Sequence, residues 1–161
     1  MNTQNRERCY PLEKEKLDLV VQELIKRSGS LVDIILEGHF PGNRLAGGKY
    51  SMGSHSITLY MEEIKNQCYQ LFSSTERFLD YFTVVFAHEL GHAEDRELVD
   101  LAEKLDLCKT EQERYQIALR IEENAWSFAE KLLPQMDHDF MQKIIYHSLK
   151  PYWDQLQLEL A

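Results

Sequence analysis

The fold is decided by an apolar stretch that ends in two histidines and a glutamate: Phe82-Thr83-Val84-Val85-Phe86-Ala87-His88-Glu89-Leu90-Gly91-His92. In a helix, residues i and i+4 lie about 40° apart around the axis, so His88 and His92 project from one face and can offer two nitrogens to one zinc ion. Glu89 sits about 100° around from His88, beside such a metal rather than on it. There it can accept a proton from the zinc-bound water, which is the general-base role in the H-E-x-x-H mechanism.

The residues that precede the pattern favour a metal over two packed or exposed histidines. Residues 82–87 are strongly apolar, which indicates a buried helix. Polar groups at the end of such a helix need hydrogen-bonding or metal partners. Gly91 leaves room beside His92 for another segment to pack closely.

A catalytic zinc normally has three protein ligands, so one more is required. The residues after His92, Ala93-Glu94-Asp95-Arg96-Glu97-Leu98, lack the histidine of the metzincin extension. A glutamate from a later helix is the remaining economical choice. The stretch Glu122-Glu123-Asn124-Ala125-Trp126 offers two such residues within a long helical segment.

The motif helix, together with Glu122-x-x-Ala125-x-x-Phe128-Ala129 and Leu132-Leu133-Pro134, resembles the ImmA/IrrE-like metallopeptidases, which are gluzincins. The resemblance covers about residues 57–134 and implies that Glu122 is the third zinc ligand. Trp126 stands where that family usually has Asn or Asp, and the spacer before Leu-Leu-Pro is shorter. The choice between Glu122 and Glu123 therefore stays open.

These observations predict a zinc-dependent metallopeptidase that uses Zn²⁺ and acts on a protein or peptide substrate. By resemblance, that substrate could be a transcriptional repressor. Two other interpretations remain: a zinc hydrolase acting on a non-peptide amide, and a non-catalytic, metal-stabilised protein that binds a partner.

Outward from the motif, hydrophobic periodicity predicts helices over residues 12–27, 62–72, 98–107 and 111–133, and a terminal one over 140–149 that is interrupted at Pro151. Ser73 and Glu76 form a capping-box pattern that predicts the start of the motif helix, over residues 75–94. Strands are expected at 31–36 and 54–61, with a glycine-rich loop over 37–53 between them. The expected fold is α+β: a single, mostly helical minimal zincin domain over residues 1–161 with a small N-terminal β-sheet.

The second strand is a candidate for substrate binding. In the resembling family a strand ahead of the motif helix borders the cleft, so Ile57, Thr58 and Leu59 are expected on an edge strand that aligns an extended peptide. A merely covered sheet edge is the alternative. Groups that can stabilise an oxyanion are His147, Tyr146, Tyr115, His138 and His55, and the sequence does not choose among them.

Composition and charge restrict the partners, the compartment and the kind of site that are expected for this chain. The net charge of −9 disfavours nucleic acid as a primary partner, because phosphate binding needs a positive surface. No stretch approaches the roughly 20 apolar residues of a membrane span, and no secretory signal is recognised, so a cytoplasmic protein is expected. The three cysteines form no C-x-x-C pair, which indicates neither a disulfide framework nor a cysteine zinc site.

Overall fold

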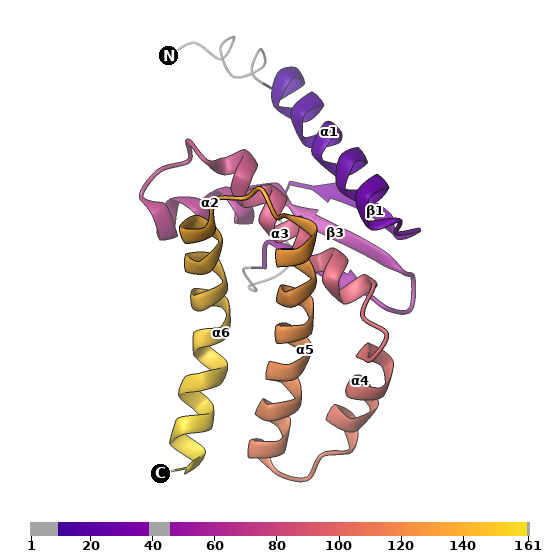
Figure 1. Ribbon diagram of the computed structural model, residues 1–161, viewed down its shortest axis with the longest axis vertical. Coiled ribbons are helices and arrows are strands. Elements are labelled where there is room, and N and C mark those ends of the chain that lie inside the picture. The colour runs from indigo at the N-terminus through magenta and orange to yellow at the C-terminus, as the bar shows by residue number, and fades with distance from the viewer. Residues whose placement is uncertain (1–9, 39–45, 161) are drawn as a thin grey trace.

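The computed structural model describes residues 10–38 and 46–160 and shows an α+β arrangement of mostly helical elements with one three-stranded sheet (Figure 1). The elements follow one another as α1 (Tyr10–Ser28), β1 (Asp33–Glu37), β2 (Gly48–Ser51), β3 (Ser56–Tyr60), α2 (Met61–Phe72), α3 (Phe78–Ala93), α4 (Leu98–Leu107), α5 (Glu111–Leu132) and α6 (His138–Leu160). The α+β class expected from the sequence is confirmed at this level.

The sheet has the strand order β1-β3-β2, so β3 is its central strand. β1 runs parallel to β3 with Asp33 opposite Ser56, and β2 runs antiparallel to β3 with Gly48 opposite Leu59. β3 has a paired strand on each side, and α3 (Phe78–Ala93) packs against it. Ile57 and Leu59 are fully buried.

β2 lies inside the stretch that the sequence predicted to be a loop, so that prediction was wrong for residues 48–51. The segment Gly48-Lys49-Tyr50-Ser51 has no alternating pattern of its own and is a strand because it pairs with β3. Gly47 reinforces the pairing, because its carbonyl accepts a hydrogen bond from Tyr60 N at 2.8 Å. The middle of the predicted loop, residues 39–45, lies outside the described residues.

α3 is the most deeply buried helix of the described chain. Phe82 and Phe86 are fully buried, and burial of one such side chain contributes about 1.5–3 kcal/mol. The sheet, α1, α2 and α5 all pack against this helix. The apolar stretch that precedes the histidines therefore fixes α3 at the centre, and the histidines follow at its C-terminal end.

The start of α3 differs from the prediction. Ser73 ends α2 in the left-handed region, with φ of 56°, and its N–H donates to Tyr69 O. Ser74 Oγ accepts from Glu76 N at 3.0 Å, which makes a local turn. The capping-box interpretation was wrong because Ser73 ends α2 and does not start α3. The helix α3 begins three residues later than predicted, at Phe78.

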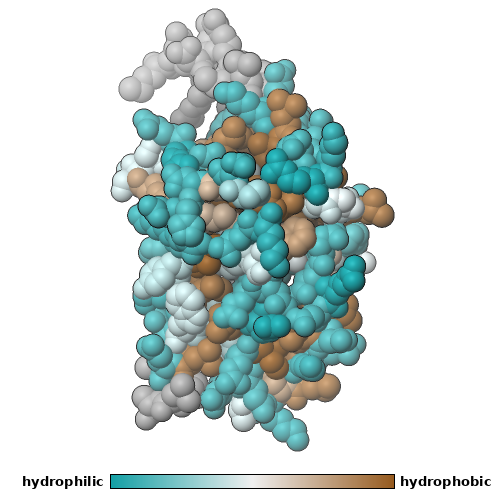
Figure 2. All heavy atoms as spheres, in the orientation of Figure 1, coloured by the Kyte–Doolittle hydropathy of each residue, from teal (hydrophilic) through white to brown (hydrophobic). Residues whose placement is uncertain are grey.

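α5 and α6 run side by side, with α4 beside α5 (Figure 1). Thr110 caps α5 by accepting a hydrogen bond from Glu113 N at 3.1 Å. α6 continues through Pro151, where the sequence predicted an interruption. Proline removes one helical N–H, but Leu149 before it is buried and Trp153 after it packs against the core, so both halves are held. Figure 2 shows a mostly hydrophilic face with hydrophobic patches in both its upper and its lower half.

Candidate metal centre

α3 places His88 and His92 one turn apart at its C-terminal end. Their ring centroids are 4.6 Å apart with the planes at 77°, and each side chain is 12% exposed. The spacing of four residues in the sequence thus leads to two imidazoles on one face, as expected.

A close crossing between α3 and α5 brings Glu122 to these histidines. A Cβ atom on Gly91 would lie 2.4 Å from the carbonyl oxygen of Ala125, so only glycine permits the approach. Glu122 lies almost one turn before Ala125 on α5. Its Oε2 is 2.8 Å from His88 Nε2, and its Oε1 is 3.5 Å from His92 Nε2.

Three donor atoms therefore converge from two helices. The ligand atoms of His88, His92 and Glu122 all lie within 4.8 Å of one another. Tetrahedral ligands at about 2.0–2.1 Å from a zinc ion are about 3.3 Å apart, which the two measured separations bracket. Two imidazoles and one carboxylate are also the donor set of many catalytic zinc sites. Glu123 is exposed and is not part of this group.

Without a metal, the cluster is an ion-pair network. Burial opposes protonation of His88, but the hydrogen bond to Glu122 and the nearby carboxylate of Glu89 outweigh it and raise the pKa of His88 to about 9. Burial likewise opposes the charged form of Glu122, but the hydrogen bonds to His88 and His92 lower its pKa well below the usual range. A metal entering this site must displace the proton on His88.

Glu89 is buried beside the cluster, with Oε1 3.4 Å from His88 Nδ1. β2 passes closely over it: a Cβ on Gly48 would lie 2.7 Å from Glu89 Cγ. The carboxylate is thus enclosed between α3 and the edge of the sheet. Gly48 was missed as a site residue, and its only sequence signal is the pair of glycines at 47 and 48.

A cavity of about 310 Å³ opens on this arrangement. Besides His88 and Glu89, it is lined by Gly47, Gly48, Gln67, Leu71, Tyr81, Val85, Trp126, Ile144, His147 and Ser148. The lining is part polar and part apolar, and α6 contributes Ile144, His147 and Ser148 to it. Of the five candidate oxyanion stabilisers, His147 lines this cavity, whereas His55 is hydrogen-bonded to Tyr50 in the sheet.

α6 reaches the site at two further residues that the sequence did not single out. Ser148 Oγ accepts a hydrogen bond from the indole of Trp126 at 3.0 Å. Tyr152 lies near the cluster, and burial together with the charge of Glu122 raises its pKa. No pattern within α6 links it to the motif, because this contact depends on how α6 packs against α5.

The expected role of Ile57, Thr58 and Leu59 requires a correction. These residues lie on the central strand β3, whose main chain is paired on both sides by β1 and β2. A peptide therefore has no free edge to pair with at β3. Among the described residues, β1 and β2 are the two border strands of the sheet, and β2 is the one beside Glu89.

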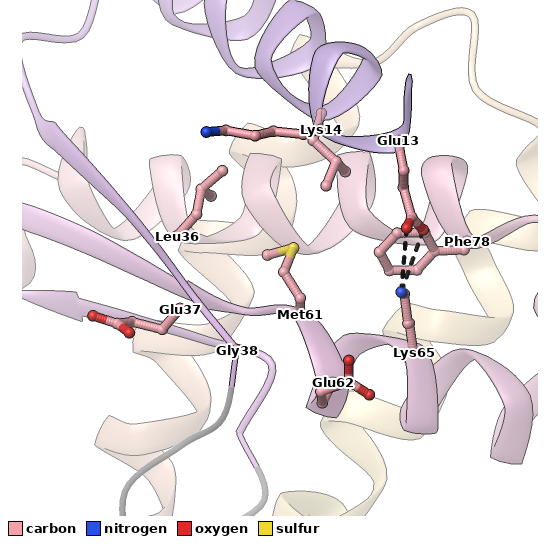
Figure 3. A pocket seen from close by; sticks show the side chains of 10 residues that line it. Glu13, Lys14, Leu36, Glu37, Gly38, Met61, Glu62, Lys65 and Phe78 are labelled. Atoms are coloured by element: carbon pink, nitrogen blue, oxygen red, sulfur yellow. Dashed lines mark hydrogen bonds and ion pairs between the residues drawn. The ribbon is translucent and has the colours of Figure 1, made fainter. Parts of the chain in front are cut away.

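A larger cavity, of about 550 Å³, lies away from the cluster between α1, the end of β1 and the starts of α2 and α3 (Figure 3). Leu17, Leu36, Met61 and Phe78 give it an apolar lining, and Lys65 pairs with Glu13 at 3.4 Å across one side. None of the three clustered ligands borders it. The larger volume does not make this cavity the better candidate, because His88 and Glu89 line the smaller one.

Comparisons with models of protein families, with curated proteins and with solved structures gave no match. Membership of the resembling family is therefore not shown. Within residues 10–38 and 46–160, no helix is both long enough and apolar enough to cross a membrane.

Proposed function

We propose that the protein is a zinc-dependent metallopeptidase of the gluzincin type, with a minimal zincin fold. The convergence of His88, His92 and Glu122 beside the buried Glu89 carries this proposal. A zinc ion in such a site acts as a Lewis acid and lowers the pKa of a water molecule toward about 7. The three ligands come from α3 and α5, which the Gly91–Ala125 contact holds together.

Glu89 is the general base of this proposal. It adjoins His88 and borders the cavity, so its carboxylate can hold a water molecule and accept its proton. It can then return that proton to the leaving amine. His147 lines the same cavity from α6 and is the candidate donor to the oxygen of the attacked carbonyl.

The border strand β2 favours a peptide over a small amide as the substrate. β2 runs past Glu89, and among the described residues no strand lies on its outer side. Main-chain pairing with such a strand aligns an extended peptide. We extend the proposal to a protein substrate, with a transcriptional repressor as the candidate that the family resemblance supplies.

The test combines metal content with substrate cleavage. We expect the purified chain to hold one zinc, located by anomalous scattering between His88, His92 and Glu122. We expect it to cleave peptides in a proteome-derived library read by mass spectrometry. Glu89→Gln should retain the zinc and lose the cleavage, because an amide cannot take the proton. Glu103→Gln, on the exposed face of α4, is the matched control and should cleave normally.

Two results would contradict the proposal. Cleavage at the wild-type rate by Glu89→Gln would remove Glu89 from the mechanism. A zinc-loaded chain that binds peptides without cleaving any of them would instead support the non-catalytic interpretation.

A further inference from the structure

Trp126 lies flat on the imidazole of His88. The ring centroids are 4.2 Å apart with the planes at 29°, and the indole is 4% exposed. Trp126 follows Glu122 by one helical turn, so α5 presents both side chains to His88. One contacts an edge of the imidazole and the other covers a face.

The indole is itself held from a third helix. Its Nε1–H donates to Ser148 Oγ on α6 at 3.0 Å. A buried indole N–H requires such a partner, and losing it leaves a buried donor unsatisfied. The contacts therefore form a chain from Ser148 through Trp126 to His88. It fixes the orientation of the indole plane and, through it, that of the imidazole.

A histidine that binds a metal through one nitrogen is usually oriented by a hydrogen bond from the other. Here His88 Nε2 faces Glu122, while Nδ1 is 3.4 Å from Glu89 Oε1. That distance exceeds the 2.7–3.2 Å of a normal N–H···O bond. Glu89 is also the proposed base, so it cannot serve as a fixed anchor. The stacked indole covers a face of the ring, where His92 meets it edge-on, and so restricts rotation of the imidazole.

We propose that Trp126 is a positioning residue for His88, and that Ser148 holds the indole so that Nε2 of His88 is aimed at the metal site. This rests on the proposed function only in taking His88 as a metal ligand. The proposal also gives a role to Trp126, which stands where the resembling family usually has Asn or Asp.

The first test measures zinc affinity by competition with a chromophoric chelator, using the full chain. Partners that orient a ligand typically change metal affinity 10- to 100-fold, so we expect Trp126→Leu and Ser148→Ala to weaken zinc binding by about tenfold or more. Ser148→Thr keeps the hydroxyl and should retain the wild-type affinity. Trp153→Leu is the control, because Trp153 packs on α6 against Tyr146.

Unfolding of the metal-free variants separates positioning from packing. If Trp126 served packing alone, Trp126→Leu would lower the unfolding midpoint while the folded fraction bound zinc as tightly as the wild type. That result would overturn the proposal. A loss of affinity in Ser148→Ala with rescue in Ser148→Thr supports it, since the volume of the core hardly changes.

The second test needs no metal. In ¹H–¹³C spectra of the metal-free protein, the ring protons of His88, assigned with His88→Gln, should be shifted upfield by the indole. The shift should disappear in Trp126→Leu and change in Ser148→Ala. Absence of the shift in the wild type would overturn the stacking. A chain that binds zinc and shows these effects without any peptide cleavage would refute the peptidase and leave the positioning role intact.

Discussion

Replacing Gly91 by alanine tests the contact that assembles the site. On an exposed helix the change would stabilise the chain by up to about 1 kcal/mol, because alanine is the better helix former. Here the added Cβ would meet the Ala125 oxygen at 2.4 Å and its Cα at 2.7 Å, whereas ordinary contact begins at 3.4 Å. α5 must therefore move by about 1 Å, and overpacking of that kind destabilises by about 1–3 kcal/mol. The expected net effect is a loss of stability.

The same displacement moves Glu122 away from the two histidines. Metal–ligand distances tolerate only about 0.2 Å, so a shift of 1 Å should weaken zinc binding by at least about tenfold. Denaturant unfolding of the metal-free protein and chelator competition measure the two effects separately. Gly53→Ala is the control, because a Cβ there meets nothing within 4 Å. A Gly91→Ala variant that was more stable and bound zinc normally would refute the close crossing.

Three further results are expected. Gly48→Ala should slow peptide cleavage without changing the zinc content of one ion per chain. The added Cβ atom would lie 2.7 Å from Glu89 Cγ and would displace the carboxylate that we propose as the general base. An unchanged cleavage rate would show that Gly48 does not confine Glu89. Glu122→Gln should weaken zinc binding in a chelator competition, whereas the exposed neighbour variant Glu123→Gln should not; the reverse order would reassign the ligand. The pKa of His88 rises from 6.5 to about 9 in the metal-free fold, so its ion pair with Glu122 should stabilise that fold fully below pH 6.5. The free energy of unfolding should then fall by on the order of 3 kcal/mol as the pH rises through 9. Urea titrations at pH 6 and pH 9.5 would measure this loss, and a His88→Gln variant with the same pH dependence as the wild type would contradict it.

The local part of the site could be predicted from the sequence. Two histidines four residues apart after an apolar run leave little freedom once the helix forms, and His88 and His92 lie as that spacing requires. Choosing Glu122 over Glu123 depends on the rotation of α5 about its axis. Ala125 and Ala129 are fully buried, and Glu122 lies on their side of the helix. The two alanines were therefore the sequence signal that this side of α5 faces α3.

The sheet could not be predicted correctly because its order depends on a strand with no pattern of its own. β2 is four residues long and contains a glycine and a lysine. Without it β3 would border the sheet, and with it β3 is central. The contacts of α6 could not be predicted for a similar reason. Trp126 and Ser148 are 22 residues apart in the sequence and meet only because α5 packs on α6.

The division of the ligands between α3 and α5 has a consequence for synthesis of the chain. α3 is complete at Ala93, whereas the helix that covers it ends at Leu132. At about 5–20 residues per second, the ribosome adds the intervening residues in about 2–8 s. Until Glu122 is added within that interval, the nascent chain carries the two histidines without their glutamate, on a helix whose surface at Gly91 is still uncovered. The proposed metal site is thus among the later features to form, and a chain that ended before Glu122 would be unable to complete it.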